Sequence, residues 1–236
     1  MRRESVPAML KIALEKEEQR GCRLMAWWQS DGAARVLAED GGVLLLERAT
    51  GPRSLAAMAR SGQDDEATRI LCEATSRLHR HRAPLPPDLV PLTDWFEPLL
   101  QARDQGGVVA EGRNVARGLL KHRQEIVVLH GDIHHENVLD AGQRGWIVID
   151  PKGLLGDRAF DFVNILRDPD ESTALAPGRF ARQVEVIAEA AALDRTHLLR
   201  WTLAFASLSA VWILGDGDHP GLDLAVAELA AAALRA

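Results

Sequence analysis

A polar segment in the middle of the chain carries side chains that suit phosphoryl transfer. After an apolar run at 126–129, the sequence continues His130-Gly131-Asp132-Ile133-His134-His135-Glu136-Asn137. The spacing of Asp132 and Asn137 is that of H-x-D-x-x-x-x-N, in which the carboxylate orients an attacking hydroxyl and accepts its proton, and the amide oxygen binds magnesium. The segment therefore predicts Asp132 as a catalytic base and Asn137 as a metal ligand.

A carboxylate that could complete the metal site follows one hairpin later. Val138-Leu139 and Trp146-Ile147-Val148-Ile149 are expected to pair across a turn at 140–142, and Asp150 comes directly after the second strand. The pairing would bring Asn137 and Asp150 to one magnesium ion, which prefers oxygen ligands. From this aspartate the sequence is Asp150-Pro151-Lys152-Gly153, in place of the D-F-G of protein kinases.

Other interpretations of the polar segment are less complete. Its histidines could bind zinc, because His130 and His134 are four residues apart. They follow a strand, however, and lack the glutamate of the helical H-E-x-x-H pattern. A loop aspartate is also a common turn residue when it stands alone. Asp132, Asn137 and Asp150 occur together in the expected strand context, and this combination favours phosphoryl transfer.

A lysine near the start of the chain is a candidate for nucleotide binding. Lys11 lies inside an expected strand at 8–14. Kinases use a lysine in such a strand to hold the α- and β-phosphates of ATP, and pair it with a glutamate on the next helix. Glu18 is the predicted partner, with Glu17 and Glu15 as alternatives. Lys11 could also be a solvated residue of an edge strand.

The segment Leu44-Leu45-Leu46-Glu47-Arg48-Ala49 is expected to join the two parts of the chain. Backbone groups between Glu47 and Ala49 are predicted to hydrogen-bond adenine, as the connecting segment does in kinases. Side-chain identity would matter little there. An ordinary strand end is the alternative interpretation.

An acceptor site is expected near the C-terminal end. Trp201 and Trp212 precede the loop Gly215-Asp216-Gly217-Asp218-His219. Carboxylates beside indole rings suit a guanidinium or ammonium group, so Asp216, Asp218 and Trp212 are predicted to bind the acceptor. The two tryptophans could instead be core residues, with the loop a solvated turn.

The elements that must position these residues fall into two groups. Residues 1–49 are expected to form a strand, a helix over 15–28 and a hairpin that turns at Glu39-Asp40-Gly41-Gly42. Residues 50–236 are expected to be mainly helical, and Asp161 is expected to cap a helix and brace the catalytic loop. Further helices are expected over 64–79, 92–103, 112–122 and from 177 onward. The predicted fold class is α+β, with a small β-rich lobe, a larger helical lobe and a cleft between them.

Composition restricts the classes of partner. The chain has 236 residues and a formal net charge of −6, which argues against a general nucleic-acid binder and suits a cationic substrate. Cys22 and Cys72 are expected to be free buried thiols. The apolar run at 203–214, broken by Ser207 and Ser209, is shorter than the roughly 20 residues of a membrane span. We therefore expect a cytoplasmic protein without a membrane anchor or an obligate protein partner.

Together these residues resemble the aminoglycoside phosphotransferase family, in particular its aminoglycoside/hydroxyurea resistance kinases, a branch that includes streptomycin 6-kinase. The matching stretches cover nearly the whole chain: Pro7–Lys11, Trp27-Trp28, Ser61–Ala67, Leu129–Leu139, Gly145–Pro151, Asp161, Asn164, Leu208–Trp212 and the loop at 215–218. The resemblance implies a two-lobed, protein-kinase-like fold that uses ATP and Mg²⁺. It also implies transfer of the γ-phosphoryl group to a hydroxyl of an aminoglycoside, with streptomycin as the favoured acceptor.

The sequence departs from this family before the lysine strand. Family members have a first hairpin there that covers the nucleotide phosphates, whereas Met1 to Pro7 are expected to be too few for two strands and a turn. Besides an antibiotic kinase, two other functions are considered. One is a kinase for hydroxyurea or another metabolite, and the other is a truncated, catalytically impaired nucleotide-binding module. The intact set of Asp132, Asn137 and Asp150 favours an enzyme.

Overall fold

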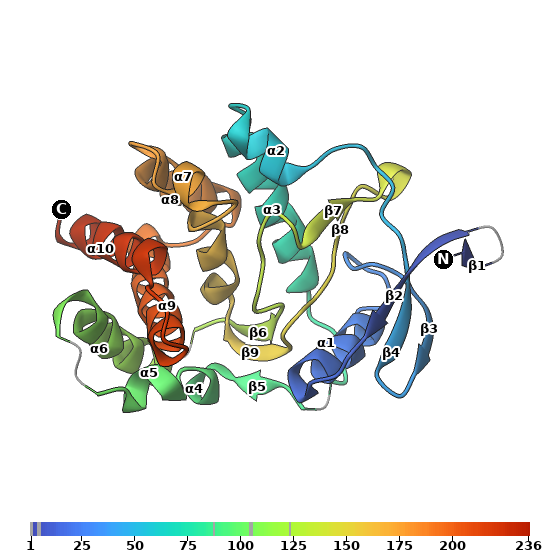
Figure 1. Ribbon diagram of the computed structural model, residues 1–236, viewed down its shortest axis with the longest axis horizontal. Coiled ribbons are helices and arrows are strands. Elements are labelled where there is room, and N and C mark those ends of the chain that lie inside the picture. The colour runs from blue at the N-terminus through green and yellow to red at the C-terminus, as the bar shows by residue number, and fades with distance from the viewer. Residues whose placement is uncertain (1, 4–5, 87, 104–105, 123) are drawn as a thin grey trace.

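The computed structural model describes residues 2–3, 6–86, 88–103, 106–122 and 124–236, whose elements form a smaller and a larger lobe (Figure 1). The smaller lobe is a four-stranded sheet of order β1-β2-β4-β3 with one helix. Neighbouring strands of this sheet run antiparallel. Its elements are β1 (Arg2–Arg3), β2 (Val6–Ile12), α1 (Lys16–Trp27), β3 (Val36–Asp40) and β4 (Val43–Glu47).

Local sequence explains the elements of the small lobe. Gly41-Gly42 turns the β3–β4 hairpin with both φ angles positive, 52° and 90°. The Glu18 carboxylate starts α1, because it accepts hydrogen bonds from the backbone N–H groups of Leu14 at 2.7 Å and Glu15 at 3.1 Å. The predicted strand, helix and hairpin are confirmed, although the lysine strand begins at Val6 and ends at Ile12.

The start of the chain contributes a short strand. β1 pairs with the beginning of β2, with Arg2 opposite Pro7 and Arg3 opposite Val6. Within the described residues, this two-residue strand is the one element before β2. Beyond Pro7, β2 pairs along its other edge with β4, where Lys11 lies opposite Leu44.

The larger lobe is mainly helical. Its helices are α2 (Leu55–Arg60), α3 (Asp64–Leu78), α4 (Leu92–Trp95), α5 (Glu97–Gln101), α6 (Gly107–Lys121), α7 (Glu171–Ala174), α8 (Arg179–Ala190), α9 (Arg195–Gly215) and α10 (Gly221–Arg235), with the 3₁₀ helices η1 (Gly142–Arg144) and η2 (Arg158–Leu166). Its strands are β5 (Val90–Pro91), β6 (Ile126–Leu129) and β9 (Leu154–Asp157), which form one sheet, and β7 (Val138–Asp140) and β8 (Trp146–Val148), which form a hairpin. In Figure 1 the two small sheets lie between the helices and the small lobe.

The predicted helices of this lobe need three corrections. The helix expected over 92–103 is two short helices that are separated at Phe96 and end at Gln101, and Pro98, which has no N–H to donate, lies in the first turn of the second. The helix expected to begin at Gly112 begins at Gly107. The cap of η2 is Asp157, which accepts from the Ala159 N–H, so Asp161 is not a helix cap.

Helix α9 forms the centre of the larger lobe. It packs against α6 and α10, and Trp201 joins Phe96, Phe160 and Phe205 in a buried aromatic cluster. By length and apolarity alone α9 could cross a membrane, which the serine-interrupted sequence did not suggest. Because 67% of its most apolar window is buried inside the protein, α9 has the surroundings of a globular core helix.

The two lobes meet closely where α1 lies on the segment after β8. A Cβ atom on Gly21, in the middle of α1, would lie 2.2 Å from the carbonyl oxygen of Pro151. Only a glycine permits this approach, even though glycine inside a helix costs about 1 kcal/mol relative to alanine. Next to this contact, the Trp28 ring stacks on His130 with a centroid separation of 6.1 Å. Helix α1 and its C-cap residue Trp28 therefore contact both the loop at 130–137 and the segment that carries Asp150.

Candidate active site

One buried carboxylate, that of Asp161, holds the backbone at the start of the loop at 130–137. Asp161 accepts hydrogen bonds from the backbone N–H of His130 at 2.9 Å and of Gly131 at 2.6 Å. His79 Nε2 lies 2.7 Å from the same carboxylate. The predicted role of Asp161 as the brace of the loop is therefore confirmed.

The His130 ring fixes the turn that follows. Its Nδ1 accepts from the Asp132 N–H at 3.2 Å, so its Nε2–H donates to the Ile149 carbonyl at 2.8 Å. Burial lowers the pKa of this imidazole and favours the neutral form that both bonds require. Both ring nitrogens of His130 are thus occupied, and among the described residues no group of three or more His, Cys, Asp or Glu side chains is arranged to hold a metal ion.

Asp132 stands at the opening of the loop, with its carboxylate partly exposed. Asn164 Nδ2 donates to Asp132 Oδ1 at 2.8 Å, and Lys152 Nζ lies 3.8 Å from Oδ2. One oxygen is thus held in place while the other faces a cation and the adjoining cleft. This is the arrangement that a positioned general base needs.

Asn137 and Asp150 lie at neighbouring ends of the β7–β8 hairpin. Asn137 Nδ2 donates to the Asp132 carbonyl at 2.9 Å, which leaves the amide oxygen for another partner. The backbone N–H of Ile149 donates to the Asn137 carbonyl at 3.0 Å, and Asp150 follows directly with a φ of +63°. An amide oxygen and a carboxylate are hard donors that fit Mg²⁺, which commonly completes its shell with phosphate oxygens and water.

A cavity of about 420 Å³ separates β2 from the β7–β8 hairpin. It is lined by Met9, Leu10, Lys11, Ile12, Glu18, Cys22, Met25, Leu46, Glu47, Arg48, Ala49, Leu139, Ile147, Ile149 and Asp150. All four residues predicted to bind the nucleotide are in this lining, together with one predicted metal ligand. Apolar side chains such as Leu46, Leu139 and Ile147 suit a flat nucleobase, and the end of the cavity that carries Lys11 and Asp150 suits the phosphates.

Lys11 and Glu18 share this cavity but do not form the expected ion pair. Lys11 Nζ pairs with the Asp150 carboxylate instead. Burial lowers the pKa of Lys11, while the charge of Glu18 raises it. The Glu18 carboxylate is engaged at the start of α1 by the backbone N–H groups of Leu14 and Glu15. Glu18 is therefore a helix-starting residue at the edge of the cavity in this structure.

The predicted adenine segment lies at the back of the cavity. The Glu47 side chain is already occupied, since it accepts from the Arg35 N–H at 2.7 Å and pairs with Arg144. The backbone N–H of Glu47 donates to the Arg35 carbonyl at 2.9 Å, and that of Arg48 to the Pro7 carbonyl at 3.1 Å. Contact of the Glu47–Ala49 backbone with adenine stays a prediction.

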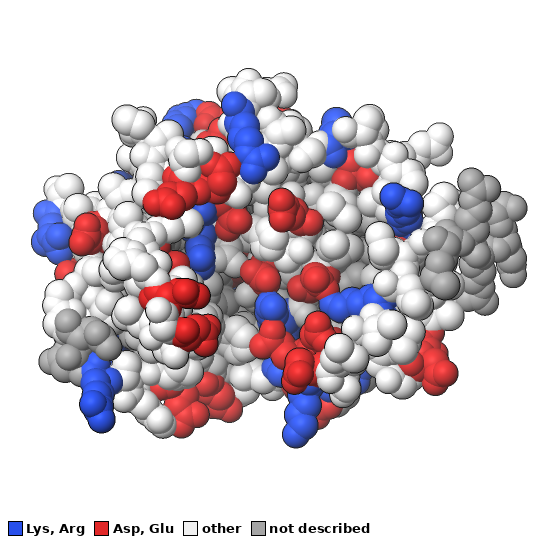
Figure 2. All heavy atoms as spheres, in the orientation of Figure 1, with Lys and Arg blue, Asp and Glu red and all other residues white. Residues whose placement is uncertain are grey.

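A second space, of about 280 Å³, opens on the other side of Asp132. It is lined by Trp95, Gly131, Asp132, His134, Lys152, Asn164, Arg167, Asp168, Phe205, Ser209 and Trp212. A wider hollow of about 530 Å³ shares Trp95, Lys152 and Trp212 with it and adds Glu17 and Asp94. We call these two spaces together the acceptor cleft. On the face seen in Figure 2, acidic and basic side chains alternate over the middle of the molecule, where the lobes meet.

The expected acceptor residues are only partly in this cleft. Trp212 lines it and meets Trp95 edge-to-face with ring centroids 5.4 Å apart. Asp216 is the C-cap residue directly after α9, and Asp218 lies two residues further on; both are exposed and neither lines the acceptor cleft. Helix α9 continues for almost a full turn after Trp212, to Gly215. The structure therefore does not bring these two aspartates to the site. Trp201 is a core residue.

Three residues of the site were not found from the sequence. Asn164 holds the Asp132 carboxylate, Lys152 lies between the two lobes, and Asp168 places a carboxylate in the acceptor cleft. None belongs to a spacing pattern with Asp132, and Asn164 is 32 residues away from it. Only the family resemblance had singled out Asn164, without a role.

Comparison with known proteins agrees with this geometry. The family model for the aminoglycoside/hydroxyurea antibiotic resistance kinases matches residues 1–217. The chain is 47% identical to a streptomycin 3''-kinase of Klebsiella pneumoniae over 98% of this chain and 90% of that protein. It is 33% identical to a streptomycin 6-kinase of Streptomyces griseus over 92% of this chain and 74% of that protein.

A solved structure supports the fold. An aminoglycoside phosphotransferase from Streptomyces rimosus, solved in complex with ADP and streptomycin, superposes with a TM-score of 0.57 at 20% identity and covers 86% of each chain. The likeness confirms the predicted two-lobed, protein-kinase-like α+β fold. With a family model matched over most of its length and relatives of this similarity, the chain belongs to the aminoglycoside/hydroxyurea antibiotic resistance kinases.

Proposed function

We propose that the chain transfers the γ-phosphoryl group of ATP to a hydroxyl of an aminoglycoside, with streptomycin as the favoured acceptor. The observation that carries the proposal is the position of two carboxylates. Asp132 opens into the acceptor cleft, and Asp150 lines the nucleotide cavity, on a hairpin joined to the same loop. The names of the streptomycin kinases that the chain resembles support the choice of acceptor.

In the proposed reaction Asp132 accepts the proton of the acceptor hydroxyl. Since Asn164 holds Oδ1, Oδ2 is the oxygen that remains for this proton. Residues 1–49 would bind ATP, through Lys11 and the Glu47–Ala49 backbone, and residues 50–236 would bind the acceptor. Because ATP supplies the phosphoryl group, we propose that the reaction takes place in the cytoplasm.

Asn137 and Asp150 would hold the divalent metal, for which we propose Mg²⁺. The ion would neutralise charge on the phosphate oxygens of the nucleotide. Lys11, which pairs with Asp150 in this structure, is the cation that would exchange this carboxylate for a phosphate. Asp150 thus has two roles, as a metal ligand and as the partner that holds Lys11 in place.

We expect Asp150→Ala to weaken nucleotide binding only when magnesium is present. A hydrogen bond to a charged group contributes about 1.5–3 kcal/mol, and we expect the loss of this charged ligand to be of the same order, roughly ten- to a hundredfold in affinity. In EDTA the affinity should stay equal or rise, because Lys11 loses its carboxylate partner. Calorimetric titration with ADP, with and without magnesium, measures both effects. Equal losses in the two buffers would contradict the assignment of Asp150 as a metal ligand.

Asp168 is the carboxylate that we propose for recognition of a cationic acceptor. It lines the acceptor cleft with Trp95 and Trp212, and indole rings beside a carboxylate suit a guanidinium group. Burial raises the pKa of the Asp168 carboxyl, whereas the charges of His134 and Arg167 lower it. Acceptor affinity should therefore weaken, as the pH falls, at a higher pH than for an ordinary aspartate.

We expect Asp168→Asn to raise the KM for streptomycin roughly ten- to a hundredfold and to leave the KM for ATP unchanged, because a hydrogen bond to a charged group contributes about 1.5–3 kcal/mol. Steady-state kinetics with each substrate varied separately measures this. The double variant Asp216→Asn/Asp218→Asn is the matched control, since both residues are exposed outside the cleft. A rise of the streptomycin KM in the control alone would move acceptor recognition to the loop after α9.

A substrate panel tests the proposed function itself. ADP release is measured with streptomycin, other aminoglycosides and hydroxyurea, and the product is located by mass spectrometry and phosphorus NMR. We expect streptomycin to give the highest kcat/KM, and the 47% identity to a 3''-kinase favours the 3''-hydroxyl. Faster turnover of hydroxyurea would favour the metabolite kinase. Nucleotide binding without transfer to any acceptor would favour the impaired binding module.

A further inference from the structure

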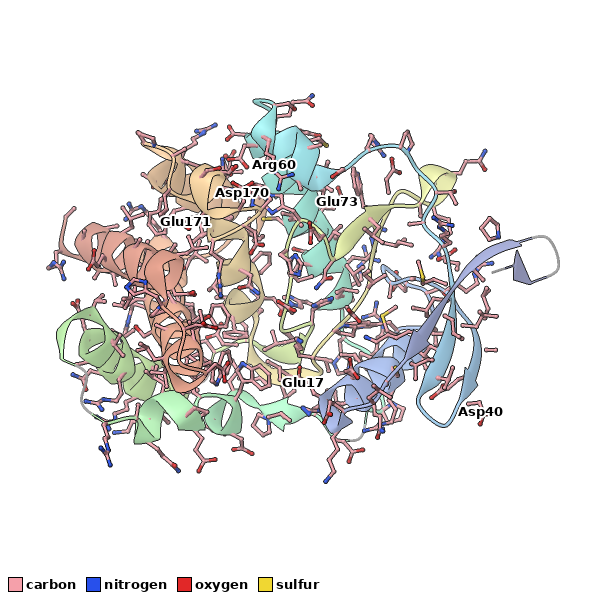
Figure 3. The ribbon with its side chains drawn as sticks, in the orientation of Figure 1. Glu17, Asp40, Arg60, Glu73, Asp170 and Glu171 are labelled. Atoms are coloured by element: carbon pink, nitrogen blue, oxygen red, sulfur yellow. The ribbon has the colours of Figure 1, made fainter. Side chains whose placement is uncertain are left out.

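Lys152 lies where the two lobes meet, in the lining of the acceptor cleft and two residues after Asp150, which lines the nucleotide cavity. Its Nζ is 2.9 Å from Glu17 Oε1 on α1 and 3.8 Å from Asp132 Oδ2 on the catalytic loop. Figure 3 shows Glu17 at the end of α1 that faces the larger lobe. The lysine side chain keeps 35% of its surface exposed and lines both parts of the acceptor cleft. Its charged end is therefore close to the base and accessible to a substrate.

The backbone around Lys152 is fixed on both sides. Its N–H donates to the His130 carbonyl at 2.7 Å, which ties it to the start of the catalytic loop. A Cβ on Gly131 would lie 2.8 Å from Leu154 Cδ1 and 3.1 Å from the Cβ of Lys152, so the absence of a side chain there lets both residues pack closely on the loop. Gly153 follows with a φ of +74° against the Arg20 side chain. The position of Lys152 beside Asp132 is thus built into the fold.

Within the cleft the Lys152 ammonium pairs with Glu17 and faces the carboxylate of Asp132. Among the described residues, no lysine or arginine other than Lys152 has a side-chain nitrogen within 4.0 Å of the Asp132 carboxylate. Arg167 lines the same part of the cleft, but its guanidinium donates to Ser209 Oγ at 2.9 Å and forms an ion pair with Asp223 at 3.1 Å. Lys11 lies in the nucleotide cavity with Asp150. A lysine ammonium has three donors on a flexible stem, so it can leave Glu17 for a phosphate oxygen.

We propose that Lys152 is a catalytic residue that binds the γ-phosphoryl group of ATP during transfer. This inference rests on the proposed function. The acceptor oxygen forms a bond to the γ-phosphorus while the bond from that phosphorus to the β,γ-bridging oxygen breaks, and the electron pair leaves with ADP. The hydroxyl proton goes to Asp132. Lys152 stays protonated and donates hydrogen bonds to the γ-phosphoryl oxygens, whose charge it offsets as the group moves.

The test compares two nucleotides that differ in the γ-phosphate. ADP and the non-hydrolysable ATP analogue AMP-PNP are titrated calorimetrically into the wild type, Lys152→Met and Lys152→Arg, all with magnesium. We expect Lys152→Met to bind ADP within twofold of the wild type and to bind AMP-PNP roughly ten- to a hundredfold more weakly. Arginine should restore most of the AMP-PNP affinity because it keeps the charge. Unchanged ADP binding also shows that the variant is folded.

Two further variants separate this role from others. Lys121→Met, at the exposed end of α6, removes a lysine far from the cleft and should change neither affinity. Glu17→Gln removes the partner of Lys152 and should leave AMP-PNP affinity intact or raise it. If Glu17→Gln reproduced the loss seen in Lys152→Met, the lysine would be a structural link between the lobes, and the proposal would be overturned.

The remaining outcomes also decide the question. Equal weakening of ADP and AMP-PNP in Lys152→Met, or no weakening of either, would overturn the role at the γ-phosphate. A higher KM for the acceptor with AMP-PNP affinity intact would assign Lys152 to the acceptor instead. A wild-type chain that binds neither nucleotide would overturn the proposed function as a whole, which is distinct from failure of the lysine proposal alone.

Discussion

Asp132→Asn should reduce phosphoryl transfer about 100- to 10,000-fold, the range that a positioned acid or base contributes. The asparagine has nearly the same shape and can still accept the hydrogen bond that Asn164 donates at 2.8 Å. It cannot accept the hydroxyl proton, so the loss falls on the chemical step. The rate of ADP release with saturating streptomycin measures this effect.

Nucleotide binding provides the internal control for this variant. Asp132 lines the acceptor cleft and is absent from the lining of the nucleotide cavity, so ADP affinity should stay within about twofold of the wild type. Asp218→Asn makes the same chemical change at an exposed position and should keep the full rate. Transfer by Asp132→Asn within about tenfold of the wild type would remove this residue from the role of base.

Asp161→Ala should produce the largest loss of stability among these variants. The substitution leaves two buried backbone N–H groups, of His130 and Gly131, without their acceptor, and His79 without its partner. An unsatisfied buried donor costs about 1–3 kcal/mol, so we expect the free energy of unfolding to fall by about 2–6 kcal/mol. That is a large part of the roughly 5–15 kcal/mol that stabilises a typical domain. Denaturant titration followed by circular dichroism measures it.

The activity of the same variant should fall as well, because Asp161 orients the loop that carries Asp132. Asp161→Asn keeps one acceptor oxygen and should lie between alanine and the wild type. Asp40→Ala is the matched surface control; Asp40 lies at the tip of the β3–β4 hairpin (Figure 3) and its replacement should change stability by no more than about 0.5 kcal/mol. A stability loss in Asp161→Ala as small as that of the control would contradict its role as a brace.

The parts of the site that the sequence predicted are those encoded over a short range. Asp132 and Asn137 share one loop, and Asp150 follows the next hairpin, so strand pairing alone brings them together. The turn glycines and the periodic apolar positions likewise predicted the β3–β4 hairpin and the helices α1 and α3. In each case the signal and its structural consequence lie within about 20 residues.

The errors came from choices that only tertiary packing makes. Glu18 was chosen as the partner of Lys11 among several glutamates, but the start of α1 competes for its carboxylate, and Asp150 reaches the lysine from 139 residues away. Asp216 and Asp218 had suitable chemistry, yet their distance from the cleft depends on where α9 ends. Lys152 was read as part of a replaced D-F-G segment, and its contact with Glu17 depends on how α1 rests on the larger lobe.

The close fit of Gly21 on Pro151 has a mechanical meaning. Two surfaces separated by a single missing methyl group cannot slide past one another, so the small lobe can move mainly by tilting about this point. The contact between Gly21 and Pro151 would then be the pivot about which the sheet of the small lobe rotates. We expect a small rotation there to move the outer strands of the sheet further than Glu17 and Lys152, which lie beside this contact. In this way the enzyme could admit a bulky nucleotide without losing the alignment at its centre.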